Sequence, residues 1–133
     1  MSTFHLKIST PDGMAFDGEV ERLRVRMIDG DVCLLAHHTD YVSAVGAGEA
    51  ALTFEDGTVR SAACIGGMLT MIKNEARLIA TTFEWAEDID KARAERAKAS
   101  AEERIAAAKD NQNEVALAKA KLQRALVRIN VKH

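Results

Sequence analysis

The sequence has few of the residues that stiffen or cross-link a chain. It contains one proline, two cysteines and 5% aromatic residues among 133. No apolar run approaches the roughly 18–20 residues that a membrane-spanning helix needs, so we expect no such helix. Basic and acidic residues nearly cancel, 18 against 20. The chain therefore lacks the basic excess that is typical of a dedicated nucleic-acid-binding protein.

Sequence motifs of catalysis, cofactor binding and metal binding are also missing. There is no phosphate-binding loop, dinucleotide-binding glycine pattern or nucleophile motif, so we predict a protein that is not an enzyme and requires no cofactor. The adjacent His37 and His38 would point to opposite sides of a strand, and no second ligand pair has zinc-finger spacing, so we predict no metal site. Residues 1–5 carry no secretory signal. Cys33 and Cys64 both lie in apolar sequence, and we expect two buried free thiols rather than a disulfide.

The residues that are present divide the chain into two parts. All 8 glycines, the proline and every aromatic residue lie in residues 1–85. Residues 86–133 contain none of these and hold 13 of the 23 alanines. The formal charge is −5 before residue 86 (7 basic, 12 acidic) and +3 after it (11 basic, 8 acidic). We therefore expect two domains, 1–85 and 86–133.

Residues 1–85 have the pattern of short strands. Segment 22–27 is the clearest, because Leu23, Val25 and Met27 alternate with three arginines. Asp-Gly pairs favour tight turns and stand at 12–13, 17–18, 29–30 and 56–57, and Gly66-Gly67 is a further break. This spacing predicts an antiparallel β-sandwich or flattened barrel of eight or more strands. The other strand-like segments are 4–9, 32–35, 41–45, 49–54, 58–65, 68–72 and 76–81.

Residues 86–133 have the pattern of an antiparallel two-helix hairpin, which we call the helical arm. A polar break at 109–113 separates two segments with seams at helical spacing. The first seam is Asp90 followed by small and apolar residues at 94, 97, 101, 105 and 108, and the second has such residues at 115, 118, 122, 125 and 129. Most of these residues are alanines, which bury little apolar surface. We expect an arm that opens or changes partners, and a permanently docked two-helix cap remains as the alternative.

Three arginines form the one cluster that suggests a ligand. Arg124 and Arg128 share a helical face, and an antiparallel hairpin brings Arg93 alongside them. Together they are suited to a polyphosphate, which guanidinium groups bind by charge-assisted hydrogen bonds. The alternative from spacing alone is a solvated basic face, or ion pairs with Glu87 and Glu95.

Several short segments follow one another along nearly the whole chain in a distinctive order. They are Phe4-His5-Leu6-Lys7-Ile8 with Thr10-Pro11, Asp29-Gly30-Asp31, Leu34-Leu35-Ala36-His37-His38, Gly46-Ala47-Gly48-Glu49 and Ile65-Gly66-Gly67-Met68-Leu69. The most specific is Ile89-Asp90-Lys91-Ala92-Arg93-Ala94, which opens the first helix. In the order of these motifs, and in its sandwich-then-hairpin layout, the sequence resembles the epsilon subunit of bacterial F-type ATP synthase.

The resemblance implies a non-catalytic subunit of the central stalk, which acts in ATP synthesis and ion transport. The sandwich would bind the gamma subunit and the c-ring and help to couple ion flow to rotation. The helical arm would fold down on the sandwich or extend into the catalytic alpha/beta head, where it inhibits ATP hydrolysis. The protein would then be peripheral at the cytoplasmic face of the bacterial cell membrane, which it meets only through the complex.

The resemblance also implies a site for regulatory ATP in the folded-down arm. The matching positions are Glu84, Ile89, Asp90, Arg93, Ala94, Arg124 and Arg128. One departure is Ser100, which stands where the family has a further arginine. For the rotor contact, the resemblance implies roles for Asp31 and His38. Both prolines of the family's loop around His38 are missing from Leu35-Ala36-His37-His38-Thr39-Asp40.

Two further hypotheses come from other functional classes. The first is a β-sandwich adaptor, unrelated to ATP synthase, whose arm binds partners as a coiled coil; it predicts a tight homodimer through residues 86–133. The second is a small hydrolase, for which the sequence offers no pair of nucleophile and base.

Overall fold

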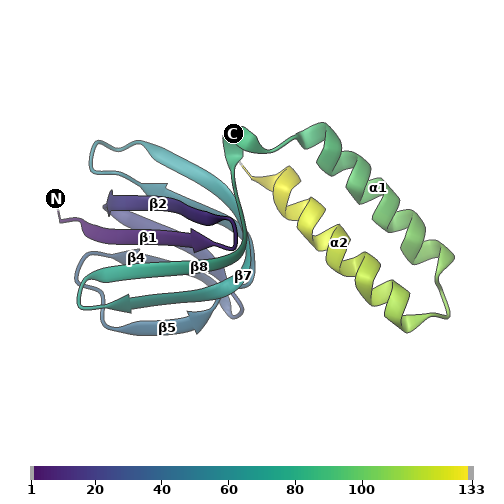
Figure 1. The fold of residues 1–133 in the computed structure, drawn as a ribbon, viewed down its shortest axis with the longest axis horizontal. Helices are drawn as coiled ribbons and strands as arrows, with labels where there is room; N and C mark the ends of the chain where they lie inside the picture. Colours follow the sequence, from purple (N-terminus) through teal and green to yellow (C-terminus); the bar gives the residue numbers. More distant parts are fainter. Residues whose placement is uncertain (1, 132–133) are drawn as a thin grey trace.

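The computed structural model describes residues 2–131, which form eight strands, a short 3-10 turn and two helices (Figure 1). The strands come first and the helices last, so the predicted sandwich followed by a helical hairpin is confirmed. The elements are β1 (Phe4–Thr10), β2 (Gly13–Val20), β3 (Arg22–Met27), β4 (Gly30–Leu35), β5 (Tyr41–Ala44), β6 (Ala47–Thr53), β7 (Val59–Ile72), β8 (Glu75–Trp85), η1 (Ala86–Asp88), α1 (Lys91–Ala107) and α2 (Gln112–Asn130).

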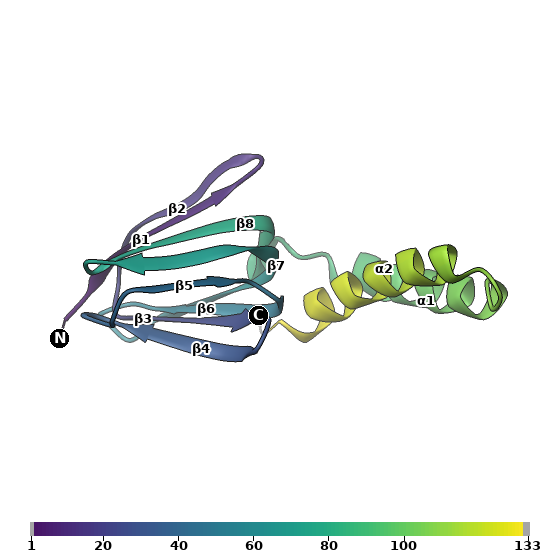
Figure 2. The same cartoon turned by 90° about the horizontal axis from the view of Figure 1, so that it is seen from below.

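The strands pack as two layers that share one continuous hydrogen-bonded path (Figure 2). The path runs β2-β1-β8-β7-β6-β3-β4, and β5 pairs with β7 beside it. The neighbours are antiparallel except β1 and β8, which run parallel. The core lies between the layers. Its most deeply buried large side chains are Phe4, Leu6, Ile8, Leu23, Met27, Leu34, Leu52, Leu69, Met71 and Leu78.

Strand β3 confirms the alternation read from the sequence. Leu23, Val25 and Met27 are at most 2% exposed, whereas the arginines that alternate with them are exposed or half-buried. A period of two places every second side chain on the same face of a sheet, so three apolar residues enter the core together. The Asp56-Gly57 turn between β6 and β7 is confirmed as well.

Gly66 and Gly67 do not end a strand, and the expected break is wrong. Both lie inside the 14-residue strand β7, with φ of 75° and 116°. A Cβ at Gly67 would lie 1.9 Å from the backbone oxygen of Ile79 on β8, so only glycine allows this close approach. The glycines bend the strand, which pairs with β6 before the bend and with β5 after it.

Two further expectations are corrected. Asp17 and Gly18 form no turn, since they pair with Lys7 and Leu6 inside β2, a strand that was not among the predicted segments. Cys64 is buried and free as expected, but Cys33 is exposed. The reason is that β4 is the last strand of the sheet and Cys33 lies on its outer face. Its neighbour Leu34 lies on the inner face and is the one fully buried residue of this strand.

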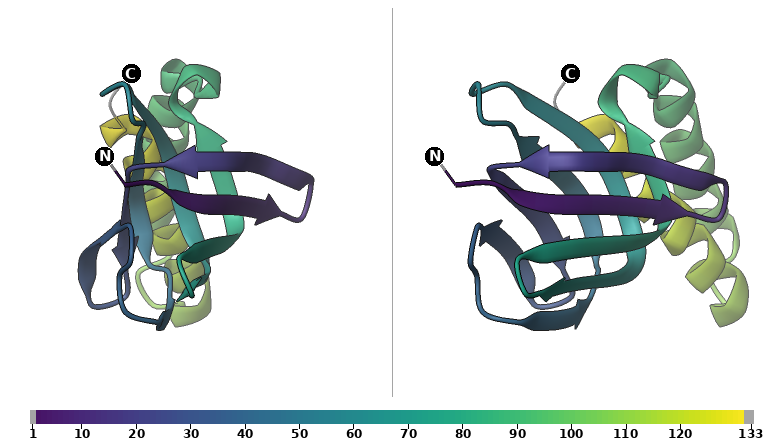
Figure 3. Two further views of the ribbon diagram at one scale, coloured as in Figure 1. Left: turned by 90° about the vertical axis from the view of Figure 1, so that its left-hand side faces the viewer. Right: turned by 60° about the vertical axis from the view of Figure 1, so that its left-hand side comes forward.

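The two helices lie side by side beyond one end of the sandwich (Figures 1 and 3). Their contact is made by small residues, with Ala94 and Ala101 buried on α1 and Ala118 and Ala125 buried on α2. Ala97 was expected in this contact but is exposed. No helix in the described part of the chain is long and apolar enough to span a bilayer.

Candidate functional site

The start of the helical arm is set by local hydrogen bonds. Asp90 caps α1, because its Oδ1 accepts from the backbone N–H of Arg93 at 3.0 Å. Asn111 caps α2 in the same way through the N–H of Glu114, at 3.2 Å. These caps fix where each helix begins and therefore which side chains share each face.

A small apolar cluster holds the arm against the sandwich. Its members are all at most 9% exposed and pack together: Ala63 of β7, Ala86 of η1, Ile89, Val127 of α2, and Val131, which directly follows α2. One ion pair lies beside this cluster, where Arg128 Nε donates to Glu84 Oε1 at 2.9 Å. Among the described residues, the arm contacts the sandwich mainly through the end of α2 and the linker, and the rest of the hairpin projects away (Figure 1).

A second contact orders the linker between β8 and the arm. The guanidinium of Arg60 lies 3.7 Å from the ring centre of Trp85, and its NH2 donates to Glu87 Oε1 at 2.6 Å. Among the described residues, Glu87 thus pairs with Arg60 of β7. Within residues 2–131, Arg93, Arg124 and Arg128 form no ion pair with Glu87, which was one alternative from the sequence.

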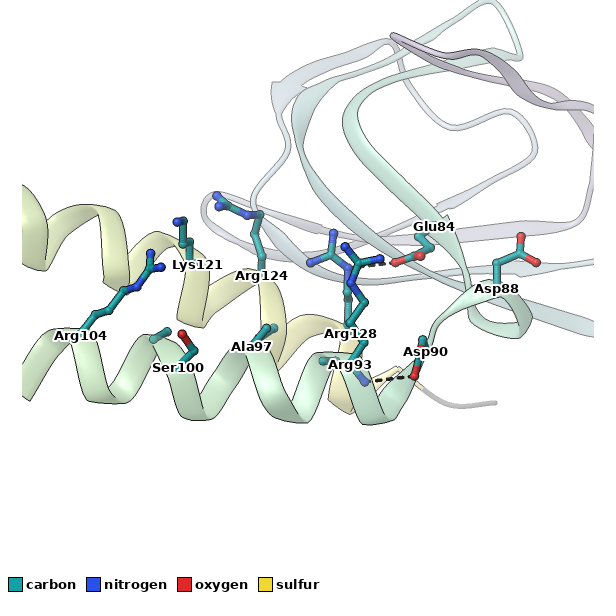
Figure 4. Close-up of a pocket in the computed structure, with 13 residues that line it drawn as sticks. Glu84, Asp88, Asp90, Arg93, Ala97, Ser100, Arg104, Lys121, Arg124 and Arg128 are labelled. Atoms are coloured by element: carbon teal, nitrogen blue, oxygen red, sulfur yellow. Dashed lines mark hydrogen bonds and ion pairs between the residues drawn. The ribbon is translucent and has the colours of Figure 1, made fainter.

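A pocket of about 490 Å³ lies between the two helices and the C-terminal end of β8, and we call this side of the pocket its sandwich end. That volume is within the range of small-molecule sites. Part of the pocket wall is built of small side chains, among them Ala97, Ser100 and Ala101, which leave the space open. The wall consists of Glu84, Asp88, Asp90, Arg93, Ala94, Ala97, Ser100, Ala101, Arg104, Lys121, Arg124, Ala125 and Arg128 (Figure 4).

The structure brings together six of the seven residues named for an ATP site. The six that line the pocket are Glu84, Asp90, Arg93, Ala94, Arg124 and Arg128. Ile89 does not line it and is instead buried in the apolar cluster that docks the arm. Ser100 lies in the wall, so the departure from the family's arginine falls inside the pocket.

Sequence analysis missed two cations of this pocket, Arg104 and Lys121. A signal for both was present. Arg93, Ala97, Ser100 and Arg104 are spaced four, three and four apart, which places them on one helical face. Lys121 is seven residues before Arg128 and therefore shares its face of α2.

The pocket holds more positive charge than its own carboxylates neutralise. Five cations and three carboxylates line it, and only Arg128 is in an ion pair. Within residues 2–131, no carboxylate lies within ion-pair distance of Arg93, Arg104, Lys121 or Arg124. Unpaired guanidinium and ammonium groups around a hollow are suited to an anionic ligand.

The two residues named for a rotor contact lie apart from this pocket and from each other. Asp31 stands near the start of β4, 3.8 Å from Arg24 NH1 and 3.9 Å from Arg26 NH1. His38 follows the end of β4, and its Nδ1 lies 2.7 Å from the backbone oxygen of Thr39. They therefore mark opposite ends of one strand rather than one cluster.

The loop that carries His38 is held by side chains of the neighbouring loops. Asn74 Oδ1 accepts from the backbone N–H of His37 at 2.6 Å, and Asp40 Oδ1 accepts from that of Lys73 at 3.1 Å. His37, Lys73 and Asn74 all have positive φ, so these bonds fix an otherwise unfavourable backbone. The loop is tied down although both family prolines are missing.

No group of three or more His, Cys, Asp or Glu residues in the described part of the chain is arranged to hold a metal ion. The buried thiol of Cys64 has its pKa raised from 9.0 to about 12 by desolvation. A thiol in that state is protonated and inert near neutral pH.

Comparison with known proteins identifies the family. The model of the ATP synthase delta/epsilon chain β-sandwich domain matches residues 3–86, and that of the long α-helix domain matches residues 87–132. The ATP synthase epsilon chain of Ruminococcus albus is 36% identical over 132 residues, covering 98% of this chain and 97% of that one. The sodium-ion-specific epsilon chain of Acetobacterium woodii is 38% identical over 103 residues, 77% of each chain.

A solved structure shares the fold. A chain in the cryo-EM structure of the Euglena gracilis mitochondrial ATP synthase, which contains OSCP, F1 and the c-ring, superposes with a TM-score of 0.83. At 16% identity the match covers 92% of this chain and 77% of that one. The family matches exclude an adaptor unrelated to ATP synthase and also exclude a hydrolase. The chain belongs to the ATP synthase delta/epsilon family, as an epsilon chain and hence a non-catalytic subunit of the central stalk.

Proposed function

We propose that this epsilon chain is a switchable rotor subunit. Its sandwich binds the gamma subunit and the c-ring and so helps to couple ion translocation to ATP synthesis. Its helical arm inhibits ATP hydrolysis when it extends into the alpha/beta head, and binds ATP when it is docked. The site of action is the cytoplasmic face of the bacterial cell membrane, where the complex makes the protein peripheral.

The observation that carries this proposal is the composition of the pocket wall. Glu84 comes from the sandwich, Asp88 and Asp90 from the linker, and the remaining residues from both helices. Lifting the arm separates Glu84 from Arg128 and removes one side of the pocket. A ligand that needs the complete pocket therefore binds the docked arm only, and stabilises it by about 2.7 kcal/mol at a hundred times its Kd.

The weak attachment of the arm supports two positions of similar free energy. The docking cluster has five buried residues, two of which are alanines. Its one adjoining ion pair is about a third exposed on each side and so contributes roughly 1 kcal/mol or less. A difference of a few kcal/mol is the range in which a ligand or a partner can decide the position of a two-state element.

An apolar sheet face supports docking to the gamma subunit. Val42, Met68, Ile72 and Ile79 are between 42% and 59% exposed. The register pairs Met68 with Ile79 and Val42 with Thr70, so all four lie on the outer face of β5, β7 and β8. Exposed apolar side chains gathered on one face are typical of a protein–protein interface.

The c-ring contact is assigned to Asp31 and His38. Both are polar, accessible and located away from the pocket, so they are free to meet a partner while the arm moves. Replacing Asp31 with lysine reverses one charge at the proposed contact. We expect Asp31→Lys to loosen assembly with the c-ring, and unchanged coupling in the assembled enzyme would contradict this assignment.

The experiment that tests the proposal compares the assembled membrane enzyme with and without the arm. Truncation after Glu87 removes both helices, and we expect ATP hydrolysis to rise while gamma and the catalytic subunits still co-purify. Unchanged hydrolysis by a fully assembled truncated enzyme would reject the inhibitory role. ATP sensing is tested by isothermal titration of the whole chain, in which no heat at millimolar ATP, with or without magnesium, would reject it.

A further inference from the structure

The carboxylates of the pocket all lie at one of its ends, whereas its cations extend along the whole length. The carboxylates of Glu84, Asp88 and Asp90 lie at the sandwich end, where β8 and the linker form the wall (Figure 4). Arg104 and Lys121 lie at the other end, on α1 and α2 respectively. Arg93 and Arg128 lie beside the carboxylates, and Arg124 lies between them and Lys121. The sandwich end therefore offers a ligand both carboxylates and cations, whereas the other end offers cations alone.

The cationic end contains three charges that are close in the wall and have no partner. Arg104 comes from α1, and Lys121 and Arg124 come from α2. No carboxylate between residues 2 and 131 is within ion-pair distance of any of the three. Like charges that converge from two helices repel each other, and a bound anion would replace that repulsion with attraction to both helices.

Ser100 leaves room for such an anion. It lies one turn before Arg104 on the same face of α1, and with Ala97 and Ala101 it keeps the middle of the pocket open. Ser100 contributes no charge of its own, and the cations of Arg104, Lys121 and Arg124 lie around this space (Figure 4).

We propose that Arg104 and Lys121, together with Arg124, form the subsite for the terminal phosphates of a nucleoside triphosphate. This inference rests on the proposed function, and it adds two binding residues and the direction in which the nucleotide lies. The carboxylates repel phosphate from the sandwich end and accept hydrogen bonds from ribose hydroxyls and base amino groups there. The phosphates consequently lie toward the tip of the hairpin, where Arg104 and Lys121 bind them from opposite helices.

The arrangement has a consequence for specificity. A terminal phosphate that contacts both Arg104 and Lys121 links α1 to α2, whereas a shorter nucleotide reaches fewer of these cations. Arg104 and Lys121 therefore make the pocket bind ATP more tightly than ADP or AMP. Removing either cation is expected to lower the affinity for ATP about tenfold, the effect of one charge-assisted hydrogen bond.

The test is a titration series with the whole chain. Isothermal titration with ATP, ADP and AMP is carried out on the wild type, Arg104→Gln and Lys121→Gln. Arg96→Gln and Lys119→Gln serve as matched controls, since each removes one exposed positive charge from the same helix outside the pocket. We expect a roughly tenfold loss of ATP affinity in the pocket variants, little change for AMP, and less than about twofold change in the controls at physiological salt.

The possible results separate the two proposals. If the wild type binds none of the three nucleotides, ATP sensing itself is rejected. If the wild type binds ATP but the pocket variants bind it equally well, only the subsite is rejected. A loss that is equal for ATP, ADP and AMP also rejects it, because that result shows a general effect of charge rather than contact with terminal phosphates.

A compensating substitution gives an independent readout. Arginine at position 100 extends from the same wall as Arg104, one turn away, so Ser100→Arg in the Arg104→Gln background should recover ATP affinity to within about threefold of the wild type. Thermal unfolding without nucleotide should be the same for Arg104→Gln and Arg96→Gln. A lower unfolding midpoint for Arg104→Gln than for Arg96→Gln would show that Arg104 has a structural role, and would overturn the proposal.

Discussion

Arg128 on α2 donates from Nε to Oε1 of Glu84 on β8, 2.9 Å away, and so connects the end of the helical arm to the sandwich. The two residues are 44 positions apart in the sequence. They also belong to the wall of the pocket, so the contact that docks the arm and the site proposed for nucleotide share the same groups.

Neutralising Glu84 should weaken docking. In Glu84→Gln the ion pair is lost while the shape of the side chain is kept, and we expect the docked state to lose roughly 0.5–1 kcal/mol. Hydrogen exchange measures this loss: the α2 amides should exchange faster than in the wild type, while the amides of the sandwich strands keep their rates. Glu95→Gln removes an exposed carboxylate from α1 and should leave exchange unchanged. Equal effects of the two substitutions would show that the ion pair does not hold the arm.

The apolar cluster should contribute more than the ion pair. Val127 is 9% exposed in the cluster, so Val127→Ala removes two buried methyl groups and should destabilise docking by about 1–2 kcal/mol. Leu117 on the same helix is 66% exposed, and Leu117→Ala is the matched control. Limited proteolysis within the arm should accelerate in the first variant only. Acceleration in both would point to general weakening of α2.

The bend of β7 should depend on glycine at position 67. Gly67→Ala places a methyl group 1.9 Å from the Ile79 oxygen and should lower the free energy of unfolding by more than about 3 kcal/mol. Gly57 also has positive φ, 89°, but nothing lies within 4 Å of its Cβ position. Gly57→Ala therefore carries the backbone cost alone, about 1 kcal/mol. Similar urea midpoints for both variants would mean that β7 and β8 move apart without cost.

The loop that carries His38 should lose its order when Asn74 is shortened. Asn74→Ala removes the acceptor for His37 N–H and should raise the hydrogen-exchange rate of that amide at least tenfold, with a small loss of global stability. Asp40→Ala should act similarly on the N–H of Lys73. If exchange at His37 stayed as slow as in the wild type, the Asn74 bond would not be what orders this loop.

The two thiols should react very differently. Burial raises the pKa of Cys64 to about 12, so almost none of it is thiolate at pH 8, whereas Cys33 is exposed on β4. A thiol reagent should therefore modify one cysteine per folded chain and two in denaturant. Cys33→Ser should abolish the reaction of the folded protein, and residual fast labelling would show that Cys64 is reached by local opening.

Local pattern was sufficient for much of the fold and for part of the site. Alternation predicted β3, and helical spacing placed Arg93, Arg124 and Arg128 on facing sides of a hairpin, because these patterns need only the residues of one element. Strand β2 was missed, since its Asp17-Gly18 pair resembles a turn when read without its partner strand. Arg104 and Lys121 were missed although they share helical faces with Arg93 and Arg128, because those faces line a pocket only when both helices are packed beside the sandwich.

By itself, the sequence determined the order of a glycine-rich, acidic sandwich followed by an alanine-rich, basic hairpin. Side-chain periodicity and backbone preference act over a few residues, so they are legible without knowing the neighbours. Tertiary structure alone decided that Gly66 and Gly67 bend a strand, that Cys33 faces outward, and that Glu84 meets Arg128. Each of these depends on strand pairing or helix docking between segments far apart in the chain, where contact geometry rather than local preference decides the outcome.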